Sequence, residues 1–194
     1  MNNAVILIPS RLAATRLPKK PLLKINNISI INHVYKIANS SIVDQSYVAT
    51  GDKEIFDEVT KYGGKCILTQ SDHKTGTDRI FEAFQKLEND NIEYVINLQG
   101  DEPMLDIQDV NNLLEKTIEK KSKVSTLACE IESEEILSKK NIVKVTTNEK
   151  LIEGKLSTAT SFVREASKTK QNIYHHIGIY IYNVNYLKKF VQFA

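Results

Sequence analysis

The chain alternates short apolar runs with segments of helical spacing up to about Lys120. The run from Ala4 to Ile8 is continuous, which is typical of a strand that is buried on both faces of a sheet. The segments predicted as strands cover residues 4–8, 43–49, 66–68 and 94–98. The segments with apolar residues every three or four positions predict amphipathic helices. These segments cover residues 30–38, 55–62, 80–87 and 107–118.

This order of strands and helices predicts an α/β fold with a mainly parallel sheet and helices on both of its faces. Ligands of such sheets bind beyond the carboxyl ends of the strands. We therefore expect the chemistry of the protein in the loops that follow Ile8, Leu68 and Leu98, and these loops have an unusual composition.

The pattern changes after Lys120, where strand signals follow one another more closely. Ile177, Ile179 and Ile181 alternate with other residues, which is the period of two that a strand produces. The predicted elements are strands at 124–130, 142–147 and 177–182 and a polar, basic loop at 165–172. No segment has the composition of a linker, so residues 1–194 are predicted to form one domain.

Composition excludes several classes of protein. With 194 residues, 41% hydrophobic and 26% charged, the chain has the balance of a folded domain rather than of a disordered one. A net charge of +2 argues against a nucleic-acid partner. The apolar runs are too short to span a membrane and no signal-peptide pattern is present, which predicts a cytoplasmic protein. Cys66 and Cys129 are far apart and are expected to be reduced, buried thiols.

The loop after the first strand carries the strongest charge signal. Its four cations are Arg11, Arg16, Lys19 and Lys20. Positive side chains at the carboxyl end of a strand favour phosphate binding, and Pro18 and Pro21 stiffen the loop. The pattern of a Walker A loop is missing. A solvated basic turn is the alternative interpretation, and the position after a buried strand favours phosphate.

The turn after the fourth strand places Asp101 next to Gly100. A carboxylate in such a turn can hold Mg²⁺, which binds through one or two carboxylates and substrate phosphates. Capping of the following helix is the alternative role for Asp101. Asp106 is better placed for that cap, which leaves Asp101 available for a metal.

Two other segments carry polar residues whose roles the residues alone leave open. Gly76 permits close approach of the backbone to a ring or a phosphate, while Thr77 or Asp78 could cap the helix that begins there. His176 stands at the start of a predicted strand, where a lone histidine is more often structural than catalytic.

Four stretches together resemble sugar nucleotidyltransferases, and most of all the CMP-KDO synthetases (3-deoxy-manno-octulosonate cytidylyltransferases). They are the run from Arg11 to Leu22, SDHKTGTDR at 71–79, NLQGDEP at 97–103 and HIGIY at 176–180. The resemblance implies a Rossmann-like three-layer αβα fold of the nucleotide-diphospho-sugar transferase type. It also implies transfer of CMP from CTP to KDO, which yields CMP-KDO and pyrophosphate.

The resemblance assigns roles to individual residues. Those implied to bind the nucleotide are Arg11, Arg16, Lys20, Thr75, Gly76 and Arg79. Those implied to orient the acid sugar are Gln99 and His176. Asp101 is implied to hold Mg²⁺, and Arg11, Lys20 and Asp101 are the implied catalytic residues. Family membership further implies a cytoplasmic homodimer that serves lipopolysaccharide biosynthesis.

The chain departs from the family pattern in two places. Thr158 stands where the family has an arginine that is expected to hold the sugar carboxylate, and Arg164 could replace it. The family segment that carries a second metal-binding aspartate is absent from these 194 residues. These departures keep two alternatives open: a shortened, nucleotide-binding relative with little or no turnover, and a cytidylyltransferase for another acidic sugar such as sialic acid.

Overall fold

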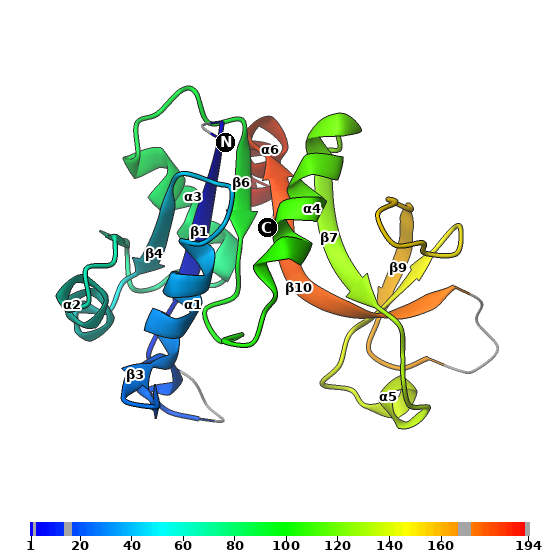
Figure 1. Ribbon diagram of the computed structural model, residues 1–194, viewed down its shortest axis with the longest axis horizontal. Helices are drawn as coiled ribbons and strands as arrows, with labels where there is room; N and C mark the ends of the chain where they lie inside the picture. Colours follow the sequence, from blue (N-terminus) through cyan, green and yellow to red (C-terminus); the bar gives the residue numbers. More distant parts are fainter. Residues whose placement is uncertain (2, 14–16, 167–171, 193–194) are drawn as a thin grey trace.

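The computed structural model describes residues 1, 3–13, 17–166 and 172–192. Within these residues, one eight-stranded sheet runs through the molecule in the order β5-β4-β1-β6-β10-β8-β9, with β7 also paired to β10 (Figure 1). Its strands are β1 (Ala4–Ser10), β4 (Ser46–Thr50), β5 (Cys66–Leu68), β6 (Tyr94–Asn97), β7 (Val124–Cys129), β8 (Lys144–Thr147), β9 (Ala159–Val163) and β10 (Ile173–Asn183). A small hairpin joins β2 (Lys24–Ile25) and β3 (Ile28–Ser29).

The first half of the sheet is parallel, as the alternation of strands and helices predicts. β1 pairs in parallel with β4 on one side and with β6 on the other, and β5 extends β4. Beyond β6 the sheet continues with antiparallel strands, because β10 runs antiparallel to β6, β7 and β8. The predicted α/β fold with a three-layer arrangement is therefore confirmed, and its parallel part holds the loops predicted to carry the chemistry.

Helices cover both faces of the sheet (Figure 1). They are α1 (Ile30–Ala38), α2 (Lys53–Lys61), α3 (Gly76–Lys86), α4 (Ile107–Glu119), α5 (Glu135–Ser138) and α6 (Val184–Gln192), with a 3-10 turn η1 at Lys20–Leu22. β1 shows why its residues form a central strand. Ile6 and Ile8 pack in a core with α1, α2 and α4, whereas Val5 and Leu7 pack with α3 and α6 on the other face. This alternation explains the continuous apolar run.

The helix beginnings follow from local capping. Thr75 caps α3: its hydroxyl accepts a hydrogen bond from the Asp78 amide, and the Asp78 side chain accepts one from the Thr75 amide. The cap is therefore Thr75 and not Thr77 or Asp78, because only the residue before the first helical turn can serve both groups. Asp106 caps α4 through the Gln108 amide, as predicted.

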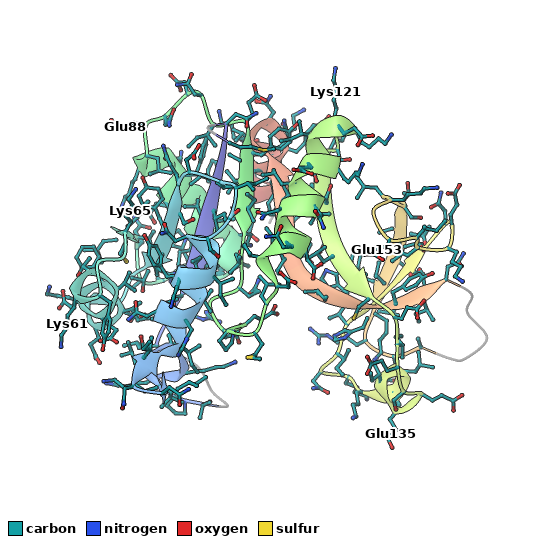
Figure 2. All side chains as sticks on the ribbon, in the orientation of Figure 1. Lys61, Lys65, Glu88, Lys121, Glu135 and Glu153 are labelled. Atoms are coloured by element: carbon teal, nitrogen blue, oxygen red, sulfur yellow. The ribbon has the colours of Figure 1, made fainter. Side chains whose placement is uncertain are left out.

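The second half of the sheet extends into a smaller lobe around β8, β9 and α5 (Figure 1). The ammonium group of Lys144 is fully buried there. It donates to the carbonyl oxygens of Lys139, Ile142 and Arg164 at 2.8, 3.0 and 2.8 Å. Three acceptors match the three protons of an ammonium group, which makes its burial tolerable. Other charged side chains, such as Lys61, Lys121 and Glu135, project into solvent (Figure 2).

Several boundaries differ from those that the pattern predicts. β10 begins earlier than expected, at Ile173, because its first residues pair with β8. Most of the predicted 165–172 loop, residues 167–171, lies outside the described residues. Cys129 is exposed at the end of β7, so the expectation of a buried thiol is wrong for it, while Cys66 is partly buried. None of the described helices is long and apolar enough to cross a membrane.

Candidate functional site

A cavity of about 600 Å³ lies at the carboxyl ends of β1 and β6. It is lined by Pro9, Ser10, Arg11, Ala13, Leu17, Lys20, Pro21, Gln99, Gly100 and Asp101. The lining comes from two of the three loops that the sheet topology singles out, those after Ile8 and after Leu98. Arg11, Lys20, Gln99 and Asp101, four of the predicted site residues, thus line one cavity. Arg16 lies outside the described residues.

Three glycines let the loops at this edge approach one another closely. A Cβ atom on Gly100 would lie 2.9 Å from the carbonyl oxygen of Pro9, and one on Gly76 would lie 3.2 Å from the Pro9 ring. A Cβ on Gly51, after β4, would lie 2.5 Å from Cα of Ser71. Gly76 therefore brings the start of α3 against Pro9, and the third predicted loop borders the cavity although it does not line it.

Two side chains of opposite charge form a close ion pair in the cavity. Lys20 Nζ donates to Asp101 Oδ2 at 2.6 Å, and the two side chains are 35% and 49% exposed. Arg11 is exposed beside them, and the next amide, that of Leu12, donates to Asp52 Oδ2 at 2.8 Å. Burial raises the pKa of the Glu102 carboxyl, as does the neighbouring charge of Asp101. The arrangement offers cations for phosphate oxygens and one accessible carboxylate for a metal.

The donor set suits Mg²⁺ held jointly by protein and substrate. Among the described residues, no group of three or more His, Cys, Asp or Glu side chains is arranged to hold a metal ion. Mg²⁺ keeps several waters and needs only one or two carboxylates when substrate phosphates complete its shell. The half-exposed Asp101 fits that requirement, whereas a metal held by the protein alone would need more ligands.

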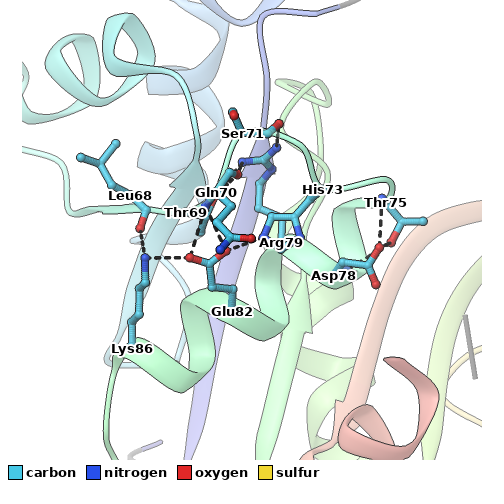
Figure 3. A network of polar contacts seen from close by, with 10 residues as sticks. All are labelled: Leu68, Thr69, Gln70, Ser71, His73, Thr75, Asp78, Arg79, Glu82 and Lys86. Carbon is cyan, nitrogen blue, oxygen red and sulfur yellow. Dashed lines mark hydrogen bonds and ion pairs between the residues drawn. The ribbon is translucent and has the colours of Figure 1, made fainter. Parts of the chain in front are cut away.

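Arg79 lies beneath the loop that connects β5 to α3, with 2% of its surface exposed. Its guanidinium donates to Thr69 Oγ1 at 2.6 Å and to the carbonyl oxygens of Gln70 and Ser71 at 2.9 and 3.2 Å (Figure 3). Burial lowers the pKa of Arg79, and the nearby Asp52 charge opposes that effect. Thr75 and Gly76, which follow this loop, are exposed at the start of α3.

Glu82 is a residue of this region that sequence reasoning missed. Its carboxylate accepts hydrogen bonds from the Gln70 amide, the His73 ring and the Lys86 ammonium (Figure 3). Burial by itself raises the pKa of Glu82, but these hydrogen bonds outweigh burial and hold the pKa at about 2, below the ordinary 4.5. The sequence does carry one signal for Glu82: it follows Arg79 by three residues on a predicted helix, so the two side chains lie on the same face.

Gln99 and His176 occupy different environments. Gln99 lines the cavity, and its Nε2 donates to the carbonyl oxygen of Gly178 at 2.9 Å. His176 is 9% exposed, lies 2.9 Å from Thr126 Oγ1, and has its ring edge-on to Phe162. Burial lowers the pKa of His176, and His175 adds to that effect. The structure therefore places Gln99 in the cavity and His176 among aromatic rings beside the sheet.

A sequence model of the cytidylyltransferases matches residues 5–194. The chain belongs to the cytidylyltransferase family. It is 39% identical over 190 residues to 3-deoxy-manno-octulosonate cytidylyltransferase of Rhodopseudomonas palustris strain BisB18, with 97% of this chain and 77% of that protein covered. The enzyme of the same name from Thermodesulfovibrio yellowstonii is 41% identical, with 96% of this chain and 78% of that protein covered.

Solved structures agree with this family. The structure of CMP:2-keto-3-deoxy-manno-octonic acid synthetase complexed with CTP matches with a TM-score of 0.88 and 36% identity, over 100% of this chain and 79% of that one. A cytidylyltransferase from Leptospira borgpetersenii shares the fold at 15% identity and a TM-score of 0.61. The family resemblance that the four sequence stretches indicate is therefore confirmed.

The segment that departs from the family pattern forms β9. Thr158 is exposed just before this strand, and its amide donates to Asn148 Oδ1 at 3.1 Å. Arg164, the candidate replacement for the family arginine, is exposed just after it and donates to the carbonyl oxygen of Lys140 at 3.0 Å. One guanidinium nitrogen of Arg164 is thus engaged within the smaller lobe.

Proposed function

We propose that this protein transfers CMP from CTP to KDO, with CMP-KDO and pyrophosphate as products. The observation that carries the proposal is the cavity at the ends of β1 and β6, where Arg11, Lys20 and Asp101 converge. It is supported by the similarity to relatives named for this reaction and to a synthetase complexed with CTP.

The reaction joins a sugar hydroxyl to a phosphorus atom. The anomeric hydroxyl oxygen of KDO bonds to the α-phosphorus of CTP, the bond from that phosphorus to the β-phosphate oxygen breaks, and the hydroxyl proton passes to solvent. Arg11 and Lys20 bind the triphosphate and neutralise the pyrophosphate as it leaves. Asp101 would hold Mg²⁺, which when bound would add positive charge at the α-phosphate and lower the pKa of the attacking hydroxyl.

The ion pair between Lys20 and Asp101 suits this division of roles. In the free protein each charge satisfies the other across 2.6 Å. A nucleotide phosphate offers Lys20 an alternative anion, and a metal offers Asp101 an alternative cation. The ion pair can therefore open on binding without leaving either charge unpaired. Gln99 lines the same cavity and is proposed to orient the acid sugar, as is His176 from the neighbouring strand. Arg16, Thr75, Gly76 and Arg79 are proposed to contribute to the nucleotide site.

The direct test is release of pyrophosphate by the purified 194-residue chain with CTP, Mg²⁺ and an acid sugar. We expect release with KDO and little with sialic acid, and tighter binding of CTP than of ATP, because a purine overfills a pyrimidine pocket. Faster release with sialic acid would assign the other substrate. Binding of CTP without release under any condition would identify a nucleotide-binding relative, and equal affinity for ATP and CTP would contradict the proposal.

The pathway, the compartment and the oligomeric state are proposed from the similarity to the same relatives. CMP-KDO would feed lipopolysaccharide biosynthesis in the cytoplasm, and the enzyme would act as a homodimer. Sedimentation of the purified chain tests the dimer. Removal of divalent cations with a chelator, followed by return of Mg²⁺, tests the metal requirement: activity should be lost and then restored.

A further inference from the structure

Two side chains of opposite charge on α3 hold the same peptide segment from its two sides. Arg79 donates to the carbonyl oxygens of Gln70 and Ser71, at 2.9 and 3.2 Å. Glu82 accepts from the Gln70 amide, at 3.0 Å to Oε2 and 3.2 Å to Oε1. Gln70 therefore has both its N–H and its C=O fixed by the helix (Figure 3).

Glu82 is itself held in place by further donors. The His73 ring contacts Glu82 Oε2, and Lys86 Nζ lies 2.7 Å from Oε1 and 2.6 Å from the carbonyl oxygen of Leu68. The Glu82 side chain is only 18% exposed, so these bonds are shielded from water. Residues 79, 82 and 86 lie on one face of α3, since they are spaced three and four apart. One helix face thus fixes Gln70, Ser71 and His73 within the segment Thr69–Thr75.

The segment is fixed next to the cavity. Ser71 lies against Gly51 at the carboxyl end of β4, where an added Cβ would come within 2.5 Å of Cα of Ser71. Gly76 lies against the ring of Pro9, which lines the cavity. The cations that suit phosphates, Arg11 and Lys20, lie on the connection that follows β1. The segment is therefore placed to border the nucleoside end of a bound nucleotide.

We propose that Glu82 is a positioning residue for the nucleoside end of the nucleotide site, acting through the Thr69–Thr75 segment rather than by contact with the ligand. This inference rests on the proposed use of CTP. Arg79 fixes the carbonyl side of the same segment, and its near-complete burial places its contribution in the same positioning role.

The test compares two ligands of the 194-residue chain by titration calorimetry: CTP, and inorganic tripolyphosphate, which offers the phosphates without the nucleoside. Glu82→Gln keeps the shape of the side chain but turns one acceptor into a donor facing the Gln70 amide or Lys86. We expect the Kd of CTP to rise about tenfold while the Kd of tripolyphosphate stays within about twofold of the wild type. Glu119→Gln on α4 is the matched control, because Glu119 forms ion pairs with Lys116 and Lys120 on the surface, far along the chain from the Gln70 segment.

Hydrogen exchange supplies a second readout. In Glu82→Gln, amides of residues 69–75 should exchange faster while those of β1 and β6 keep their protection. If Glu82→Gln fails to fold, His73→Ala is the second variant, because it removes one donor to Glu82. It should also weaken CTP binding more than tripolyphosphate binding and speed exchange of the same amides, by smaller amounts. Unchanged CTP binding in a variant with an altered segment, or equal weakening of both ligands, would overturn the inference. If the wild type binds CTP no better than tripolyphosphate, the proposed function itself fails.

Discussion

Gly100 lies in the turn after β6, directly against Pro9 of β1, and Gly100→Ala tests whether that contact sets the geometry of the site. A Cβ at this position would lie 2.9 Å from the Pro9 carbonyl oxygen, with Ile31 Cδ1 at 3.4 Å and Ile8 Cγ2 at 3.5 Å. β1 cannot yield, because it pairs with β4 on one side and β6 on the other. The turn must therefore move away, and it carries Asp101.

The required movement is about 0.5 Å, since ordinary contacts of a Cβ begin near 3.4 Å. Forced displacement of this kind costs about 1–3 kcal/mol of folding free energy. The 2.6 Å contact between Lys20 and Asp101 would lengthen, because Asp101 directly follows the moved residue. If Asp101 holds Mg²⁺ as proposed, displacement of its carboxylate on this scale should lower the rate of pyrophosphate release by about tenfold or more.

Urea unfolding measures the stability, and a pyrophosphate assay measures the turnover. Gly178→Ala is the matched control, because the same methyl group would there meet Gln99 Cγ only at 3.8 Å, an ordinary van der Waals distance. Alanine also restricts the unfolded chain, which stabilises both variants by about 0.4–1 kcal/mol. The free energy of unfolding of Gly178→Ala should therefore match or slightly exceed that of the wild type. Wild-type stability and turnover in Gly100→Ala would refute the steric reasoning.

Three further predictions concern buried or paired charges. Asp101→Asn should weaken CTP binding less than about threefold yet slow pyrophosphate release about 100-fold, because the Mg²⁺ that Asp101 is proposed to hold would act mainly on charge that develops at the α-phosphate. Equal release by both proteins would remove Asp101 from the reaction. The pKa of Glu82 is about 2 in the folded protein and 4.5 ordinarily, so its contribution is complete above pH 4.5 and is lost as the pH falls towards 2. In urea titrations the free energy of unfolding of the wild type should exceed that of Glu82→Gln by at most about 3 kcal/mol at pH 7 and by roughly half as much at pH 3. A difference that is independent of pH would contradict this. Lys144→Met leaves the carbonyls of Lys139, Ile142 and Arg164 without their donor and should cost about 2–4 kcal/mol by the same titration, whereas unchanged stability would show that water replaces the ammonium.

The parallel half of the sheet could be predicted because its central strands, β1 and β6, are buried on both faces. Ala4–Ile8 in β1 and Tyr94–Ile96 in β6 are continuous apolar runs, and runs as short as these, bounded by turn residues, are typical of buried strands. The cationic loop and Asp101 followed from their position at strand ends, where the fold brings separate loops together. The apolar strands, the cationic loop and Asp101 could be predicted because each depends only on residues that are close together in the sequence.

Features that depend on partners far away in the sequence could not be predicted. β9 contains Thr160, Ser161 and Phe162, of which Thr160 and Phe162 are exposed, and it pairs only with β8 among the described strands, so its pattern of burial is weak. The place of His176 depends on Thr126, fifty residues earlier, whose hydroxyl also contacts the Ile179 carbonyl oxygen at 2.6 Å. The role of Glu82 depends on where Gln70 lies after folding.

The order of the strands also has a consequence for synthesis on the ribosome. β6 pairs with β1 on one edge, but its other edge is completed by β10, where Asn97 pairs with Tyr180 about 80 residues later. At translation rates of about 5–20 residues per second, that edge waits about 4–16 s for its partner strand. During this interval an apolar strand with unpaired amides and carbonyls is a template for pairing with other nascent chains. The nascent protein is therefore most exposed to aggregation while the residues between β6 and β10 are made, and chaperone binding in that window would protect it most.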